Sequence, residues 1–268
     1  MRVEKVANRF QAVQALLRCP LCGQTLGIKE NALVCRAGHR FDLSGKNYAN
    51  LAPWQKQGAY RRDLFESRAA VFDGGFYQPV AEKIAAMVPP EACCVLDAGC
   101  GEGYYAACVA TPERRVLAAD LSKDAVALAA RRPGVYALVA DLARLPLKNG
   151  VVDVVLDILS PANYAEFARV LAPGGRIVKI APGRDYLAEV RALTGKRGYD
   201  DERVVSHFQT HTAETSVCEV RYTRPVTRAQ ARQFLQMTPL ALHAGPWDEA
   251  ALFGEITIHL LVMSGRCV

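Results

Sequence analysis

Apolar and polar positions along the chain form blocks of two kinds, and their alternation predicts an α/β fold. Apolar runs with the length of strands occupy residues 94–97, 115–119, 135–139 and 151–158. Segments with helical spacing lie before, between and after these strands: residues 79–87, the segment from Ser122 onward and residues 163–171. This alternation predicts a doubly wound sheet. Later runs bring the expected total to seven strands with a late hairpin: strands at 176–181, 218–222 and 255–263, and a helix at 227–237.

Two further stretches precede this body. Apolar residues recur at helical spacing in residues 2–18 and predict an amphipathic helix that packs against the body or a second subunit: Val3, Val6, Phe10, Val13 and Leu17. Residues 44–68 are irregular, with Pro53 and Gly58. We interpret them as a linker and substrate-facing loop. Its candidate phosphate contacts are Lys56, Arg61 and Arg62.

A glycine-rich segment, residues 95–103, joins the first strand to a helix and predicts a cofactor pocket. A dinucleotide fingerprint would have a third glycine at Tyr104, and a phosphate loop would have Gly-Lys-Ser or Gly-Lys-Thr. Acidic residues instead favour a cationic ligand with a ribose and no phosphate, which is the chemistry of S-adenosylmethionine. The candidate contacts are Asp97, Gly99, Gly101, Glu102 and Gly103.

Two more acids follow the next two strands. Asp120 ends the second strand, where a ribose diol is held in such sheets. Asp141 follows the third strand, within reach of an adenine edge if the strands lie side by side. The alternative is that both acids only end strands or cap helices.

Cysteines provide the second strong motif. Cys19, Cys22, Cys35 and His39 follow the spacing Cys-x2-Cys-x12-Cys-x3-His. Three thiolates and one imidazole form a closed tetrahedral set, which is typical of structural zinc. A redox Cys-x-x-Cys would lack the distal Cys and His. The other cysteines are interpreted as small core residues with reduced thiols: Cys93, Cys94, Cys100, Cys108, Cys218 and Cys267.

Positive charge is concentrated at the front of the chain. Residues 1–72 contain 12 Lys+Arg against five Asp+Glu, whereas the remaining 196 residues contain 21 against 22. This basic N-terminal part favours a partner with a phosphate backbone. The alternative is a solvated basic face without a partner. No apolar run approaches the ~20 residues that cross a bilayer. The expectation is a cytoplasmic protein that does not bind membranes.

His207 and His211 stand four residues apart and would share one face of a helix. They could form a metal pair, but no third ligand is evident for a zinc site. A polar segment that faces substrate is therefore the favoured interpretation.

The chain resembles the RlmA family of 23S ribosomal RNA guanine-N1 methyltransferases over nearly its whole length from Cys19 onward. The resemblance is carried by the zinc motif, the glycine loop and these segments: Phe41-Asp42, Tyr48-Ala49-Asn50-Leu51, Phe76-Tyr77-Gln78-Pro79, Ser122-Lys123, Leu145-Pro146, Ser160-Pro161, Pro173-Gly174-Gly175, Pro182-Gly183 and Gln236-Met237-Thr238-Pro239. One departure is visible, since eighteen residues precede the first zinc cysteine and the family's first cysteine lies almost at the chain start.

This resemblance implies a class I, Rossmann-like, seven-stranded S-adenosylmethionine-dependent methyltransferase domain with a small zinc-binding module that recognises RNA. It implies methyl transfer to guanine N1 in a 23S rRNA hairpin, at nucleotide 745 or 748, and a homodimer with an RNA cleft. It adds Tyr77 and Tyr186 as cofactor contacts, for which the alternative is a core aromatic role. The expected layout is a helical extension at 1–18, the zinc module at 19–52, a linker at 53–75 and the methyltransferase domain at 76–268.

Methyl transfer from a sulfonium is an in-line displacement, and guanine N1 must lose its proton before or during attack. The candidate catalytic groups are Asp157 at the end of its strand and the following turn, with Ser160 and Asn163. Asp157 has the alternative interpretation of a buried strand-end acid. Exocyclic-amine methylases have Asn-Pro-Pro-Tyr or Asp-Pro-Pro-Tyr here, so its absence favours a ring nitrogen. Two other functions stay open: a small-molecule methyltransferase with a purely structural zinc, and a non-enzymatic RNA-binding protein.

Overall fold

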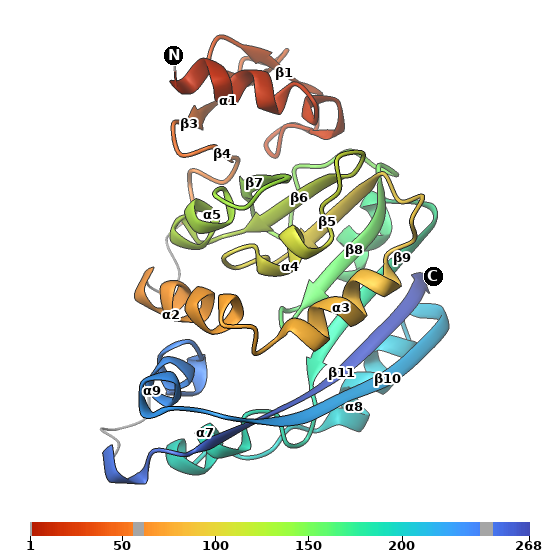
Figure 1. Cartoon of the computed structure of the whole chain (residues 1–268). Coiled ribbons are helices and arrows are strands. Elements are labelled where there is room, and N and C mark those ends of the chain that lie inside the picture. Colours follow the sequence, from red (N-terminus) through yellow and green to blue (C-terminus); the bar gives the residue numbers. More distant parts are fainter. Residues whose placement is uncertain (1, 56–61, 242–248) are drawn as a thin grey trace.

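The computed structural model describes residues 2–55, 62–241 and 249–268, and its strands form one continuous sheet (Figure 1). The seven predicted strands make up its larger part, in the order β7-β6-β5-β8-β9-β11-β10. Five are parallel: β5 (Cys94–Ala98), β6 (Arg115–Asp120), β7 (Val135–Val139), β8 (Val152–Ile158) and β9 (Leu171–Pro182). The strand β11 (Glu255–Cys267) is antiparallel to both β9 and β10 (Thr212–Pro225).

The strand order fixes where a ligand can bind. The strand β5 lies in the middle of the parallel strands. The strands β6 and β7 follow it on one side of the sheet, and β8 and β9 lie on the other side. Open α/β sheets bind ligands outside the carboxyl ends of the strands at such a switch point. The glycine segment leaves β5 at that point.

The sheet is larger than the seven strands predicted from the sequence. Three antiparallel strands form the N-terminal part: β1 (Leu26–Lys29), β2 (Ala32–Cys35) and β3 (Arg40–Ser44). The short strand β4 (Tyr48–Asn50) pairs with β3 on one side and lies parallel to β7 on the other. The N-terminal strands therefore extend the central sheet to eleven strands within the described residues.

Helices cover both faces because neighbouring strand residues bury their side chains in opposite directions. Val95 belongs to one core, together with residues of α3 (Gln78–Met87), α4 (Tyr104–Cys108), α7 (Ala188–Thr194) and α9 (Arg228–Gln236). Leu96 belongs to the other, together with residues of α1 (Arg2–Phe10), α6 (Tyr164–Val170) and α8 (Asp201–Gln209). The helix α2 (Arg62–Asp73) packs against α9 and α5 (Lys123–Ala129). Three short 3-10 helices complete the elements: Gln14–Leu16, Pro239–Ala241 and Glu249–Ala251.

Several local predictions were wrong. The helix predicted over residues 2–18 ends at Phe10, where the chain turns, although Val13 and Leu17 are buried all the same. The stretch interpreted as irregular contains β4 and the first part of α2. Two helices, α7 and α8, were not predicted. Cys93 and Cys108 are exposed and are not core residues.

The extension before the zinc motif packs against the body, as predicted. Val6 and Phe10 are fully buried, and Arg9 lies over the Tyr136 ring and donates to the Val135 carbonyl. None of the helices in the described residues is both long and apolar enough to cross a membrane.

Candidate active site and metal centre

The loop after β5 needs its glycines for backbone shape and for close packing. Gly99, Gly101 and Gly103 have φ values of +81°, +54° and +78°, which L-residues rarely adopt. A Cβ on Gly99 would lie 2.7 Å from the Ser160 Cβ, and one on Gly103 would lie 2.8 Å from the Ala129 Cβ. The loop is thus pressed between the turn after β8 and the end of α5.

Beside this loop lie buried polar atoms that have no hydrogen-bond partner among the described residues. They are one carboxylate oxygen of Asp97, one of Glu102 and the Tyr105 hydroxyl. Burial raises the pKa of Asp97 to about 8, and the nearby acids Glu102 and Asp120 add to the effect. Burial likewise raises the pKa of Glu102 to about 7, against the opposing charge of Arg68. These acids fit a ligand that brings positive charge and N–H or O–H donors.

Asp120 and Asp141 lie at the same edge, because β6 and β7 are neighbours. The Asp120 carboxylate accepts hydrogen bonds from the backbone N–H groups of Gly101 and Ser122, at 3.0 and 2.8 Å. Asp141 accepts from the Gln55 amide at 2.8 Å and from the Ala143 N–H at 2.9 Å. Asp120 therefore ties the glycine loop to the end of β6.

Tyr77 and Tyr186 come together although they are 109 residues apart. Their hydroxyls lie 2.9 Å apart, and both side chains are buried in the core under α3 and α7. Burial raises the pKa of Tyr77 well above its ordinary value. Tyr186 also acts on the pKa of the buried Tyr105, which follows the loop, so the core interpretation and a ligand contact are compatible.

One residue beside the loop was missed by the sequence reasoning. Arg68, on α2, lies 3.6 Å from where a Gly101 Cβ would stand. It belongs to the stretch interpreted as a linker, where no local pattern indicated that a helix would cover the glycine loop.

The end of β8 holds a buried ion pair. Lys179 of β9 donates to Asp157 at 2.6 Å and to the Ser160 carbonyl at 3.3 Å. Burial raises the pKa of Asp157 to about 6, although Lys179 opposes the shift. Leu159 follows with φ +52°, and Ser160 turns its side chain onto Gly99. The pair thereby fastens the turn that touches the glycine loop.

Asn163 has a local role in the same turn. Its carbonyl oxygen accepts from the Glu166 N–H and caps α6, and its amide donates to the Leu142 carbonyl. Both ends of this side chain are therefore in use within the protein, which favours a capping role over contact with a substrate.

The four predicted metal ligands form one cluster. The ligand atoms of Cys19, Cys22, Cys35 and His39 all lie within 4.8 Å of one another. The Nδ1 atom of His39 is 3.5 Å from the Cys19 Sγ and 3.4 Å from the Cys35 Sγ, and Cys22 and Cys35 are 3.7 Å apart. Tetrahedral zinc bonds to sulfur and nitrogen give ligand separations of about 3.5–3.8 Å. The cluster fits a closed zinc site.

His207 and His211 do not belong to a second cluster of this kind in the parts of the chain that the structure describes. Their rings lie 4.8 Å apart, and the His211 ring meets the edge of Tyr164 at 4.2 Å. Both rings thus pack with Tyr164, and the role of a segment that faces substrate stays a prediction.

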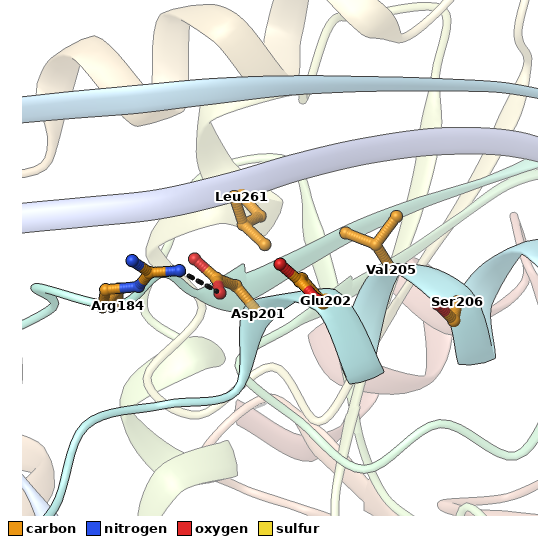
Figure 2. Close-up of a pocket in the computed structure, with 6 residues that line it drawn as sticks. All are labelled: Arg184, Asp201, Glu202, Val205, Ser206 and Leu261. Atoms are coloured by element: carbon orange, nitrogen blue, oxygen red, sulfur yellow. Dashed lines mark ion pairs between the residues drawn. The ribbon is translucent and has the colours of Figure 1, made fainter.

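Two cavities lie away from the glycine loop. One, of about 460 Å³, is shown in Figure 2, where α8 faces β11 and Arg184 approaches Asp201 at 3.8 Å. It is lined by none of the predicted site residues. The other, of about 680 Å³, is strongly basic and is lined by Lys5, Lys46, Arg62, Lys123 and Arg131, among others. Of the predicted phosphate contacts only Arg62 lines it, and Lys56 and Arg61 lie outside the described residues.

Comparisons with known proteins match both parts of the chain. Residues 95–175 match a family described as a methyltransferase domain, and residues 17–59 match the family of the RlmA N-terminal zinc ribbon. The YcgJ protein of Bacillus subtilis has the same fold, with a TM-score of 0.51 and 14% identity over 70% of this chain and 98% of its own.

Two relatives are similar over nearly their whole length. The 23S rRNA (guanine(748)-N(1))-methyltransferase of Streptomyces fradiae is 32% identical, over 92% of this chain and 94% of its own. The YxjB protein of Bacillus subtilis, provisionally named a 23S rRNA (guanine-N(1)-)-methyltransferase, is 34% identical over 90% and 92%. The seven-strand order, the glycine loop and the zinc cluster agree with this similarity. The chain belongs to the RlmA family of 23S rRNA (guanine-N1)-methyltransferases.

Proposed function

We propose that this protein transfers a methyl group from S-adenosylmethionine to N1 of a guanine in a 23S rRNA hairpin, at nucleotide 748 or 745. The observation that carries the proposal is the pair of buried carboxylates beside the glycine loop, Asp97 and Glu102, each with one oxygen that has no partner among the described residues, in a chain that also has a zinc cluster. The named activity of the Streptomyces fradiae relative supports the substrate and favours position 748.

The residues around the loop fit the proposed cofactor in detail. The oxygens of Asp97 and Glu102 are suited to N–H and O–H donors, and Asp120 stands where a ribose is held. Gly99, Gly101 and Gly103 allow a ligand to approach the backbone, and Asp141 lies at the edge proposed for adenine. We assign the buried hydroxyl pair of Tyr77 and Tyr186 to the same pocket. When bound, S-adenosylmethionine supplies an electrophilic methyl group on a sulfonium.

The protein's own contribution to the reaction is chiefly alignment, which is worth roughly 7–11 kcal/mol of a barrier. Lys179 and Asp157 hold the turn after β8, whose Ser160 side chain rests on Gly99. Asp157 is fully buried, so we assign it with Lys179 to positioning this turn. Ser160 is partly exposed there, and we assign its hydroxyl to the contact with the guanine. Asn163 caps α6 and keeps the turn in register.

A basic surface supports RNA as the substrate. The larger cavity lies between α1, the turn from β3 to β4, the start of α2, and α5, and Lys5, Lys46, Arg62, Lys123 and Arg131 line it. Cations from the N-terminal part and from the methyltransferase domain are thus directed at one space. Phosphate contacts of this kind position a nucleic acid without reading its sequence. The small-molecule alternative would have favoured an enclosed apolar lid.

Two finer expectations stay predictions. A homodimer with an RNA cleft between subunits follows from the family resemblance alone. Action on ribosomal RNA agrees with the cytoplasmic location that was expected from the sequence.

The function is tested by incubating the purified protein with S-adenosylmethionine labelled in the methyl group and a 23S rRNA transcript, followed by reverse transcription. Methylation at guanine N1 blocks Watson–Crick pairing, so the polymerase should stop one nucleotide before the modified base. A transcript with adenine at position 748 serves as the matched control, with a second one altered at 745. Absence of both label and arrest on every hairpin fragment would reject the RNA substrate.

A further inference from the structure

The side chain of Arg68 extends from α2, which packs against α9 and α5, to the glycine loop. Its Nε and Nη2 atoms donate to the Met237 carbonyl at 3.3 and 3.0 Å, and its guanidinium lies 5.6 Å from the Phe65 ring centroid. These contacts hold the side chain in place. The remaining nitrogen, Nη1, is the one that approaches Gly101, at 3.6 Å from the position of a Cβ.

Within the described residues, Arg68 forms no ion pair with a carboxylate, although acids surround it. Its charge lowers the pKa values of Glu102 and Asp120 against the larger effect of burial, and it also acts on Tyr186. The neighbouring Arg132 differs, because its Nη1 is paired with Asp73 at 2.8 Å. Arg68 is thus a fixed cation with an unused donor that points to the loop.

The chemistry of the proposed cofactor gives this cation a partner. Its amino-acid end has an ammonium group and a carboxylate on the same carbon. Asp97 and Glu102 suit the ammonium, but they would repel the carboxylate unless a positive group stood beside it. A guanidinium binds carboxylates through fixed, charge-assisted hydrogen bonds.

We propose that Arg68 binds the carboxylate of S-adenosylmethionine through Nη1, beside Gly101 of the glycine loop. This inference rests on the proposed function and adds a binding residue from α2. Because Arg68 also holds the Met237 carbonyl, cofactor binding would tie α2 to the segment that follows α9.

The test compares two ligands that differ only in this carboxylate. S-adenosylhomocysteine and its decarboxylated analogue are titrated into the whole protein by calorimetry, with wild type, Arg68→Met and Arg68→Lys. Arg228→Met serves as the control, because Arg228 on α9 is exposed and lies outside the basic cavity. Arg68→Met should weaken S-adenosylhomocysteine binding on the order of 10-fold to 100-fold, as expected for a hydrogen bond to a charged group. The affinity for the decarboxylated analogue should not change.

Arg68→Lys keeps a cation and should recover part of the lost affinity, whereas Arg228→Met should bind both ligands as wild type does. An equal loss for both ligands in Arg68→Met would show a structural role and overturn the proposal, as would an unchanged affinity for S-adenosylhomocysteine. Failure of wild type to bind either ligand would reject the cofactor itself, and is thereby distinguished from failure of the Arg68 contact.

Discussion

One added methyl group in the glycine loop tests how tightly that loop is packed. At Gly99 an alanine would combine a φ of +81° with a Cβ only 2.7 Å from the Ser160 Cβ. We expect Gly99→Ala to lower the free energy of unfolding by more than about 1 kcal/mol, because strain and overlap add. It should also weaken S-adenosylhomocysteine binding, since the turn with Ser160 must move. Urea unfolding and calorimetry measure the two effects.

Gly195 offers a matched control for the strain alone. Its φ is +66°, and nothing lies within 4 Å of a Cβ placed there. Gly195→Ala should therefore cost less stability than Gly99→Ala and leave the cofactor affinity unchanged. Equal effects of the two substitutions would show that the contact with Ser160 is unimportant.

The buried pair Asp157–Lys179 predicts a stability loss that depends on pH. Lys179→Met leaves Asp157 without its counter-charge, and breaking such a pair costs about 3–5 kcal/mol. The pKa of Asp157 is already raised to about 6 in the wild type, and loss of Lys179 should raise it further. An acid whose folded pKa is raised loses stability as pH increases above its unfolded value. The deficit of the variant should thus be larger at pH 8 than at pH 5 in urea unfolding.

The double variant Lys179→Met with Asp157→Asn removes both charges and should recover part of the loss. It should still have a lower rate of methyl transfer, because the turn after β8 is no longer tied by Lys179 to the Ser160 carbonyl. A deficit of Lys179→Met that is the same at both pH values would contradict the assigned ion pair.

The zinc cluster is expected to stabilise the three N-terminal strands β1 to β3. Leu26, Leu33 and Phe41 from these strands are buried in the core that they share with α1 and the central sheet. Metal binding should supply much of the folding free energy of so small a module. We expect about one zinc per chain by elemental analysis. Cys22→Ser should lower hydrogen-exchange protection in β2 and β3 while β5 and β6 stay protected.

Cys93→Ser is the control for this experiment, since Cys93 is exposed and lies outside the cluster. It should keep both the zinc content and the exchange pattern of wild type. Full protection of β2 and β3 in Cys22→Ser without zinc would reject a structural role for the metal.

Elements with strong local signals could be predicted from the sequence, and those held by distant partners could not. The apolar runs of β5, β6 and β7 are bounded by polar residues, and their limits agree with the structure to within one residue. By contrast β4 has only three residues, and it is defined by pairing with β7, far along the chain. The helix α2 was not predicted, because the apolar and polar positions of residues 44–68 follow an irregular pattern. Val6, Phe10, Val13 and Leu17 are buried as the helical spacing predicts, but this spacing did not predict the turn after Phe10.

The same distinction applies to the candidate site. The glycines and the zinc ligands are specified by spacing within short segments, and the structure brings each set together. The proposal that Tyr77 and Tyr186 contact the cofactor needed the family resemblance, since nothing local distinguishes a ligand-facing tyrosine from a core one. Arg68 depends on how α2 folds across the loop, which no local pattern reveals.

At the scale of the whole molecule, one sheet joins the metal centre to the cofactor loop. The strand β4 links β3 to β7, so the N-terminal strands are held against the methyltransferase domain rather than on a free linker. Figure 1 shows them beyond β7, at the end of the sheet away from β10. This arrangement directs the basic residues of both parts into one cavity, which an RNA backbone could follow.

The salt dependence of RNA binding tests this shared surface. Lys46 comes from the N-terminal strands and Lys123 from α5, and both are exposed lining residues of the basic cavity. The double variant Lys46→Gln with Lys123→Gln should weaken binding of a 23S rRNA hairpin. It should also reduce the slope of log affinity against log salt by about two, one for each lost phosphate contact. Filter binding at several salt concentrations measures the slope, and the affinity for S-adenosylhomocysteine should stay at the wild-type value.

A second double variant that removes the same net charge distinguishes phosphate contacts in the cavity from an effect of the protein's overall charge. Lys83 on α3 and Arg228 on α9 are exposed and lie outside the cavity lining. Lys83→Gln with Arg228→Gln removes the same net charge and should leave the slope nearly unchanged, because counterions are released only where phosphates are contacted. If both double variants reduced the slope equally, the cavity would have no special role and RNA would be attracted by net charge alone. A reduced slope for the cavity variant alone would place the RNA backbone across the junction between β4 and α5.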